Sequence, residues 1–189
     1  MFVAFLLLQA RGKVRCDMRN VRAPIAALVF SVGLGLVAGT ASATDIRGTI
    51  SSTLTITEDS QLVGDVTCTV TGAPCIDFGA SGIALKLNGF SLTGQGDAVT
   101  GCAGSQVAGE HGIRVNGLRG VVIQGPGIVQ RFRFEGIQIV GGSSRVLVTQ
   151  VTASTNCRSG IFVGASSDNE IEANISVRNG NGTNPCGGI

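Results

Sequence analysis

The chain has 189 residues, of which 43% are hydrophobic, 14% are charged and 29 are glycines. Glycine is about twice as frequent as its usual share of roughly 7%, but the large hydrophobic fraction excludes a collagen-like or disordered chain. The formal net charge of +2 comes from the N-terminal segment, because residues 44–189 contain nine basic and eleven acidic residues. The charge therefore gives no support to a nucleic-acid partner.

The N-terminal segment is predicted to direct export. From Met18 the chain has a basic start, an uncharged apolar run over residues 25–38 and an A-x-A cleavage site at residues 41–43, the three parts of a signal peptide. We therefore predict a signal peptide over residues 18–43 and a mature chain that starts at Thr44. The apolar run is short for a membrane span, which needs about 20 residues; a retained anchor is the alternative. Residues 1–17 precede an already complete signal, and we interpret them as a doubtful extension.

Export predicts that the mature chain is secreted, periplasmic or displayed at the cell surface, with no membrane span after cleavage. Five cysteines remain in it: Cys68, Cys75, Cys102, Cys157 and Cys186. In an oxidising compartment such cysteines tend to pair. Cys68 and Cys75 flank a short turn-like stretch and are the first expected pair. The closer thiol sets of a zinc site are absent from the sequence.

A short phrase recurs along the second half of the chain. Gly112-Ile113-Arg114-Val115 is followed by Gly136-Ile137-Gln138-Ile139 and by Gly160-Ile161-Phe162-Val163, with 24 residues between successive glycines. An earlier copy at Gly82-Ile83 lies 30 residues before Gly112, which predicts a loop insertion in that repeat, and the chain ends on Gly188-Ile189. We assign residues 44–81 to an N-terminal cap with the first strands, and residues 82–189 to the repeats.

A repeat of this length holds two or three short strands and cannot bury its apolar side alone, so neighbouring repeats must stack. We predict an all-β fold, a right-handed parallel β-helix of roughly four to five coils. A β-sandwich gives no reason for a fixed period, and the L-x-x-L-x-L pattern of a leucine-rich solenoid is missing. Strand alternation places Ile113, Val115, Ile137, Ile139, Ile161 and Val163 inside, and Arg114, Gln138 and Phe162 outside.

The last phrase begins a coil that the sequence does not complete. Solenoids end in a cap that covers the last apolar layer, and we therefore expect a C-terminally truncated product. Cys157 and Cys186 each lie just before a Gly-Ile phrase. Neighbouring coils would bring them within reach of each other, so they are the second expected disulfide.

The segment ALKLNGFSLTGQG (residues 84–96), with the recurring G-I-x-V coils after it, resembles the secreted bacterial proteins with right-handed parallel β-helix repeats. The resemblance covers about residues 62–189. It implies the pectate-lyase-like fold, whose members include pectate lyases, polygalacturonases and alginate epimerases as well as non-catalytic surface proteins. The fold alone does not choose among these activities.

Residues one repeat apart become neighbours on stacked coils. This rule places His111, the single histidine of the sequence, beside Glu135, with Glu110 close by. A histidine beside a carboxylate can move a proton on an acidic sugar, so His111 and Glu135 are the catalytic candidates. The substrate-binding candidates are Arg114, Arg133 and Arg158. The alternative is a turn histidine in an ordinary surface ion pair.

A second candidate site lies near the end of the chain. If Ile171 points inward, Glu170 and Glu172 share the outward face of one strand, and with Asp168 they offer oxygen ligands for Ca²⁺. A solvated strand face is the alternative reading. No cofactor is otherwise required.

Two functions follow from these features. The first is an exported β-helix that binds and acts on an acidic polysaccharide, as a lyase, epimerase or glycoside hydrolase. The second is a non-catalytic scaffold, surface or adhesion module. We expect a monomer in either case.

Overall fold

Parallel strands make up the regular structure of the described chain. The computed structural model describes residues 42–97, 102, 106–180 and 189, which belong to one compact unit, Gly39–Ile189. The described residues contain thirteen strands and no helix, and accordingly no helix among them could cross a membrane. Most of the predicted signal peptide, together with Cys186 and Gly188, lies outside the described residues.

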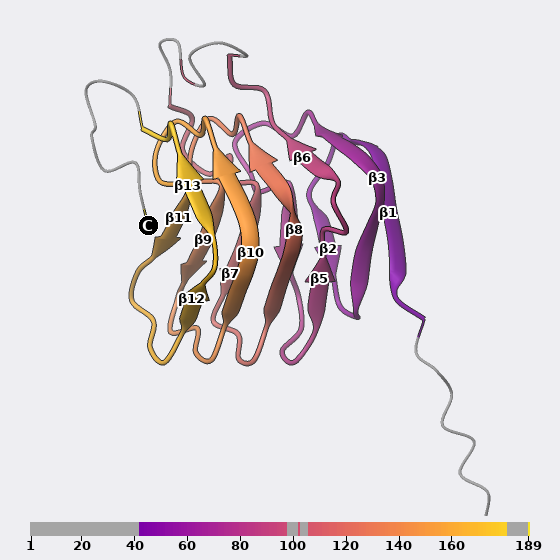
Figure 1. Ribbon diagram of the computed structural model, residues 1–189, viewed down its shortest axis with the longest axis vertical. Helices are drawn as coiled ribbons and strands as arrows, with labels where there is room; N and C mark the ends of the chain where they lie inside the picture. The colour runs from indigo at the N-terminus through magenta and orange to yellow at the C-terminus, as the bar shows by residue number, and fades with distance from the viewer. Residues whose placement is uncertain (1–41, 98–101, 103–105, 181–188) are drawn as a thin grey trace, which may run out of the picture. The chain divides into compact units, whose positions relative to one another are not determined.

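The strands form two parallel sheets, which we call sheet A and sheet B (Figure 1). The main path of sheet A consists of β1 (Thr44–Ile50), β3 (Ser60–Cys68), β5 (Ala84–Lys86), β8 (Val122–Gln130), β10 (Leu147–Ser154) and β12 (Glu170–Glu172). Two further strands extend it: β6 (Ser91–Thr93) pairs with β3 and β8, and β13 (Ile175–Val177) pairs with β10. Strand β1 begins at Thr44, where the mature chain is predicted to start.

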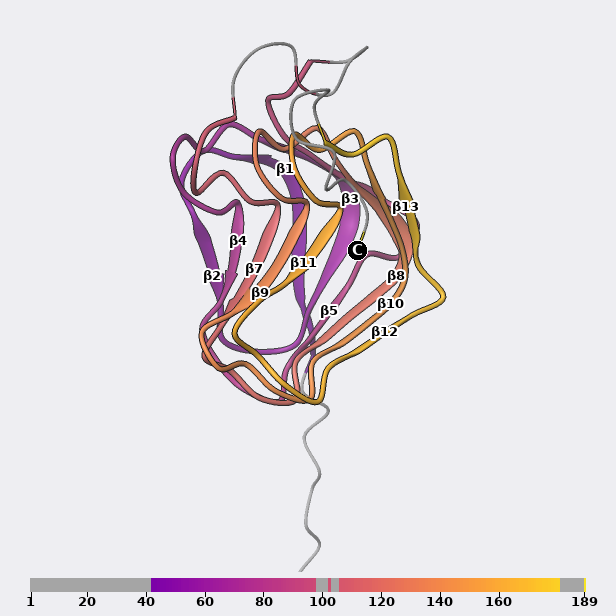
Figure 2. The same cartoon turned by 90° about the vertical axis from the view of Figure 1, so that its left-hand side faces the viewer.

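Sheet B has five strands: β2 (Leu54–Ile56), β4 (Ile76–Phe78), β7 (Ile113–Asn116), β9 (Ile137–Val140) and β11 (Ile161–Val163). Figure 2 shows them side by side. From β7 onward the chain passes alternately between the sheets, through β8 in sheet A and β9 in sheet B, then β10 and β11. This arrangement is compatible with a parallel β-helix.

The repeated phrase supplies the register of sheet B. Ile113 pairs with Ile137, and Ile137 pairs with Ile161, so the 24-residue period of the sequence is the step from one strand to the next. The isoleucines of this row are fully buried, as expected for inward-facing side chains. Val163 continues the second inward row, in register with Ile139, but remains 39% exposed.

The interior is filled by aliphatic side chains from both sheets. Leu85, Ile123 and Val148 form a fully buried row of sheet A, and they share one apolar cluster with the isoleucines of sheet B. Burying one such side chain contributes about 1.5–3 kcal/mol. Because each strand contributes alternate residues, every repeat adds one layer to the cluster.

The glycine of the phrase is needed for close packing between repeats. A Cβ on Gly112 would lie 2.5 Å from the backbone oxygen of Gly136, and a Cβ on Gly136 would lie 2.7 Å from that of Gly160. Real Cβ atoms do not approach oxygen this closely. The next repeat therefore passes directly over each of these glycines.

Gly82-Ile83 is not an earlier copy of the phrase, and the assignment made from the sequence is wrong. Strand β5, which follows Gly82, pairs with β3 and β8 in sheet A. The residue that precedes Ile113 in its row is Ile76, 37 residues earlier. Gly82 has a positive φ of 73° and nothing near its missing Cβ, so it is a turn glycine.

Asparagine side chains connect successive repeats where the strands turn. Four backbone N–H groups donate, at 2.8–3.0 Å, to an asparagine Oδ1 of the next repeat: Phe132 to Asn156, Val146 to Asn169, Val151 to Asn174 and Asn156 to Asn179. Three of these side chains also donate to a carbonyl of the preceding repeat: Asn156 to Val129, Asn174 to Val148 and Asn179 to Ala153. The side-chain amides thus provide hydrogen-bond partners for backbone N–H and C=O groups at the turns, where strand pairing is interrupted.

Candidate functional site

The polar candidates predicted from the sequence lie on three successive segments that lead into sheet B. His111 lies two residues before β7, Glu135 two residues before β9, and Arg158 three residues before β11. The stacking rule is therefore confirmed for this corner. We call His111, Glu110, Arg133, Glu135, Arg158 and Phe134 the polar corner cluster.

His111 and Glu135 are in contact inside the protein. Nδ1 of His111 lies 2.8 Å from Oε2 of Glu135, and the side chains are 5% and 1% exposed. The two atoms nevertheless lack a well-aligned hydrogen bond. The other carboxylate oxygen of Glu135 lies 3.1 Å from Nη1 of Arg158, which is 35% exposed. Glu135 is thus a buried carboxylate with a cation on its solvent side.

Glu110 is the second buried carboxylate of the cluster. Its two oxygens accept from Nε and Nη2 of Arg133 at 2.5 and 2.6 Å, and Oε1 also accepts the backbone N–H of Gly72 at 3.0 Å. The hydrogen bond with Glu110 raises the pKa of the Arg133 guanidinium above its usual value. A two-pronged pair of this kind fixes both partners in position.

Phe134 lies between the histidine and an arginine. Its ring centroid is 5.3 Å from that of His111, and Cζ of Arg158 lies 4.6 Å from it, over the ring. A cation over an aromatic face is attracted by the ring quadrupole. The ring therefore holds Arg158 where it also contacts Glu135.

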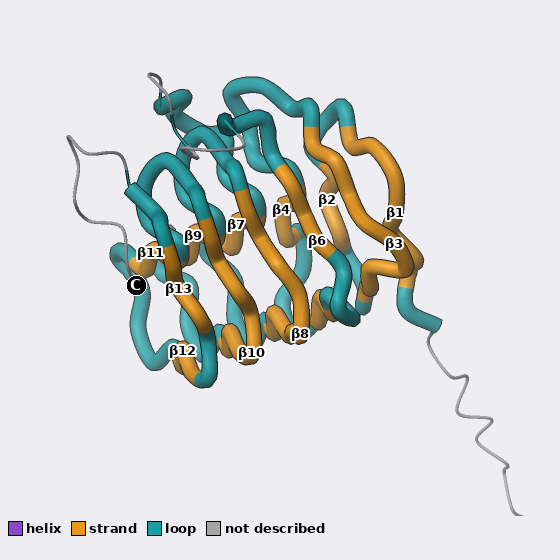
Figure 3. The backbone as a smooth tube through the Cα atoms, turned by 45° about the horizontal axis from the view of Figure 1, so that its top comes forward, coloured by secondary structure: helices purple, strands orange, loops and turns teal. Residues whose placement is uncertain are grey.

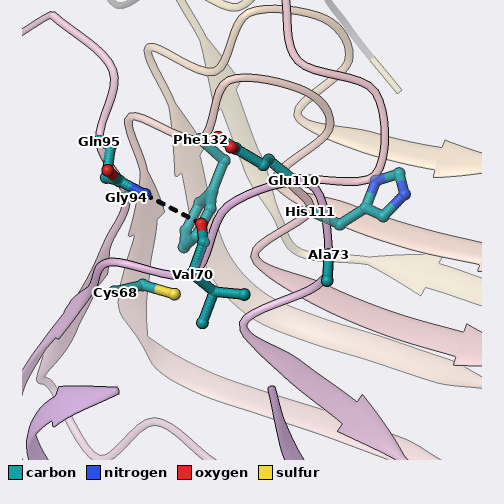
Figure 4. A pocket seen from close by; sticks show the side chains of 8 residues that line it. All are labelled: Cys68, Val70, Ala73, Gly94, Gln95, Glu110, His111 and Phe132. Carbon is teal, nitrogen blue, oxygen red and sulfur yellow. Dashed lines mark hydrogen bonds between the residues drawn. The ribbon is translucent and has the colours of Figure 1, made fainter. Parts of the chain in front are cut away.

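A narrow crevice lies beside the cluster. It is lined by Cys68, Val70, Ala73, Gly94, Gln95, Glu110, His111 and Phe132 (Figure 4). Gln95 donates across it to the carbonyl of Val70 at 2.9 Å. The crevice leaves no free volume for a water molecule, and the His111 ring points away from it (Figure 4). No sugar-sized space therefore adjoins His111 on this side.

Arg114 is placed apart from the polar corner cluster. It lies on the outward face of β7, where its Nε and Nη2 donate to the two Asp77 oxygens at 3.0 and 2.7 Å. The hydrogen bond with Asp77 raises the pKa of the Arg114 guanidinium. Of the three predicted substrate-binding arginines, the structure brings Arg133 and Arg158 to the cluster and leaves Arg114 in its own ion pair.

The acidic residues proposed for Ca²⁺ are not gathered into one cluster. Glu170 and Glu172 are exposed on either side of Ile171, as predicted. Asp168 lies in a turn with a positive φ of 56° and accepts from its neighbour Ser167. Across the described ranges, no three His, Cys, Asp or Glu side chains come close enough to hold a metal ion.

The described part of the chain contains two disulfides. Cys68 is joined to Cys75, as expected, with 6.0 Å between the Cα atoms. Cys157 is joined to Cys102, with 4.8 Å between the Cα atoms, so the expected pair with Cys186 is wrong. The residues inserted before β7 reach this corner, since Gln106 donates to the carbonyl of Cys157. One of these inserted residues is Cys102, the disulfide partner of Cys157, whose position the regular repeat period does not predict.

The sequence interpretation did not predict that Glu110 pairs with Arg133, nor that asparagine side chains bridge successive repeats at the turns. Glu110 and Arg133 are 23 residues apart, and so are Asn156 and Asn179. Both separations are one residue shorter than the 24-residue period that located Glu135, so the rule places Glu110 and Asn156 one position away from their partners.

These features define an all-β protein with two parallel sheets, asparagine-bridged turns and a buried polar corner closed by a disulfide. The chain matches no protein-family model, no curated protein and no solved structure.

Proposed function

We propose that this chain is an exported, right-handed parallel β-helix of four to five coils that serves as a non-catalytic scaffold. The observation that carries the proposal is the state of the polar corner cluster. Its two carboxylates are 4% and 1% exposed, and each contacts an arginine one repeat away. The groups predicted for catalysis are thus engaged in holding neighbouring repeats together.

The β-helix part of the proposal is supported by the path of the chain. From β7 to β11 the chain passes alternately between the two sheets, and β7, β9 and β11 of sheet B, like β8 and β10 of sheet A, are parallel and about one repeat apart. Connections between parallel strands of one sheet are right-handed in about 98% of cases. Export is supported by the signal-peptide pattern and by two disulfides, which persist in oxidising compartments.

A second candidate function is action on an acidic polysaccharide. It is favoured by the solvent side of the cluster, where Arg133 and Arg158 keep 26% and 35% of their side-chain surface exposed next to Phe134. Guanidinium groups bind carboxylates well. Both arginines already have carboxylate partners inside the protein, however, which favours the structural role.

Glu135→Gln separates the two functions. The scaffold proposal predicts no turnover of pectate or alginate by the wild type, and a loss of about 2 kcal/mol of unfolding free energy in the variant, because Arg158 and His111 lose their anionic partner. Asp168→Asn is the matched control at an exposed turn, where the loss should stay below about 0.5 kcal/mol. Denaturant unfolding and a glycan turnover assay provide the two readouts.

The proposal fails if the wild type turns over an acidic glycan and Glu135→Gln abolishes that activity without lowering the unfolding free energy. His111→Ala should then have the same effect. This outcome would assign the cluster to catalysis.

A further inference from the structure

Three asparagines of the described chain are followed directly by glycine: Asn88, Asn116 and Asn179. A fourth, Asn181, lies outside the described residues. Glycine has no Cβ, so its backbone nitrogen is unshielded and can attack the side-chain amide of the asparagine before it. Each of these pairs is therefore a candidate site of chemical modification, and the structure decides which of them is free to react.

The backbone does not distinguish the three sites. In each case the N–H of the glycine donates to a carbonyl of a neighbouring repeat, and this hydrogen bond must open before the nitrogen can react. The donors and acceptors are Gly89 and Pro126, Gly117 and Val140, and Gly180 and Asn156. The difference between the sites must therefore come from the asparagine side chains.

Two of the side chains are held by hydrogen bonds. Nδ2 of Asn88 donates to Oε1 of Gln61 at 3.2 Å and to a neighbouring backbone carbonyl at 3.1 Å. Asn179 accepts from the backbone N–H of Asn156 at 3.0 Å and donates to the carbonyl of Ala153 at 2.9 Å. These amides must break at least two hydrogen bonds before they can turn toward the glycine nitrogen.

The side chain of Asn116 is not held in this way. Asn116 is the exposed last residue of β7, beside β9 (Figure 3), and its amide has no hydrogen-bond partner among the described residues. It lies over Gly141, which has no side chain to displace it. A Cβ built on Gly141 would lie 3.1 Å from Cγ of Asn116 and 3.2 Å from the nitrogen of Gly117. The two atoms that would react thus face the same side.

We propose that Asn116 is a site of spontaneous deamidation, with water as the only co-reactant. The Gly117 nitrogen loses its proton to hydroxide and forms a bond to Cγ of Asn116, while the bond from Cγ to the side-chain nitrogen breaks and ammonia leaves. Water then opens the cyclic imide. Cleavage at Cγ gives aspartate, and cleavage at the backbone carbonyl gives isoaspartate. In both products a neutral amide has become a carboxylate.

The isoaspartate product changes the main chain of sheet B. It adds a methylene group to the backbone between positions 116 and 117, where Asn116 pairs with Val140 and the Gly117 N–H donates to the Val140 carbonyl at 3.1 Å. The chain after β7 then falls out of step with β9. The reaction should therefore lower the stability of the protein. The proposal goes beyond the scaffold function and does not depend on the polar corner cluster.

Peptide mapping tests the order in which the sites react. The purified folded protein is kept for several weeks at mildly alkaline pH, then denatured, reduced and cut with trypsin, which places Asn116 in a separate peptide, residues 115–119. Tandem mass spectrometry gives the converted fraction at each asparagine. Asn116 should react about tenfold or more faster than Asn88 and Asn179, because their side chains must first break two ordinary hydrogen bonds.

The unfolded chain and one variant are the controls. In strong denaturant with reduced disulfides, Asn88, Asn116 and Asn179 should react at similar rates, because no native hydrogen bond remains. Asn116→Gln keeps an amide but would have to close a larger ring, so its peptide should stay unchanged. The same incubation should lower the melting temperature of the wild type more than that of Asn116→Gln.

Two results overturn the proposal. One is conversion of Asn88 or Asn179 in the folded protein at the rate of Asn116 or faster. The other is an Asn116 that stays intact in the folded protein while the unfolded chain reacts. A converted wild type with an unchanged melting temperature refutes the effect on sheet B. None of these results bears on the scaffold proposal, which rests on Glu135.

Discussion

Asn156 provides a sharp test of how the repeats are held together. Its side chain is 1% exposed and has three partners: it accepts from the backbone N–H of Phe132 and donates to the carbonyl of Val129 and to Oδ1 of Asn179. Replacement by alanine leaves the Phe132 amide buried without an acceptor. It also removes a donor from the Val129 carbonyl.

The expected loss follows from these contacts. A buried amide without a partner costs about 1–3 kcal/mol, and the carbonyl and the space left by the side chain add to this. We therefore expect Asn156→Ala to lower the unfolding free energy by about 3 kcal/mol. With a slope of roughly 2 kcal/mol per molar urea, the midpoint falls by about 1.5 M. Equilibrium urea unfolding followed by circular dichroism measures this shift.

Two comparisons complete this experiment. Asn116→Ala changes the same residue type at the exposed end of β7, and its effect should stay within about 0.5 kcal/mol. Asn156→Asp keeps an acceptor for the Phe132 amide but loses both donated hydrogen bonds, so it should lower the unfolding free energy more than Asn116→Ala does. If Asn156→Ala shifts the midpoint no more than Asn116→Ala does, the bridging role is refuted.

Two further predictions concern the repeat glycines and pH. Gly136→Ala should lower the unfolding free energy by about 2 kcal/mol or more, because its Cβ would lie 2.6 Å from the Asn156 amide nitrogen and 2.7 Å from the Gly160 oxygen. Gly142→Ala, at an open turn with positive φ, is the control and should cost about 1 kcal/mol through backbone strain alone. Thermal unfolding measures both losses, and equal losses in the two variants contradict the packing argument. Hydrogen bonds from the backbone and hydroxyl of Ser91 hold the pKa of Asp65 below its usual 3.8, so its stabilising effect is present above that value and disappears as the pH falls through the lower folded-state pKa. The difference in melting temperature between the wild type and Asp65→Asn should accordingly shrink between about pH 6 and about pH 2.5, and a difference that grows over this range contradicts the assignment.

The regular half of the fold could be predicted because the phrase and the strand step have the same period. Ile113, Ile137 and Ile161 pair in the order that their spacing indicates. The assignment of Gly82-Ile83 to the repeated phrase was wrong, because a turn glycine with positive φ and a close-packed glycine cannot be distinguished in the sequence. Only the contacts of the missing Cβ separate them.

The candidate site could be predicted in part. Stacking located Glu135 beside His111, since both precede their strands by the same distance. It did not reveal their burial, which involves the residues inserted before β7: Val107 donates to the carbonyl of Arg133. The partner of Cys157 was missed for the same reason. The path of an insertion is set by its own contacts, and a repeat period carries no information about it.

That insertion has a consequence for how the molecule can vary. Asp77 and Arg114 are neighbours although 37 residues separate them, whereas regular repeats of sheet B are 24 residues long. Both sheets keep their register across the longer repeat, since Leu92 still pairs with Val129 as Ile76 does with Ile113. The number of residues between β6 and β7 can therefore change without a change in the strand pairing of either sheet. A graft or a natural length change after Thr93 would alter the surface beside the corner and leave the strand pairing intact.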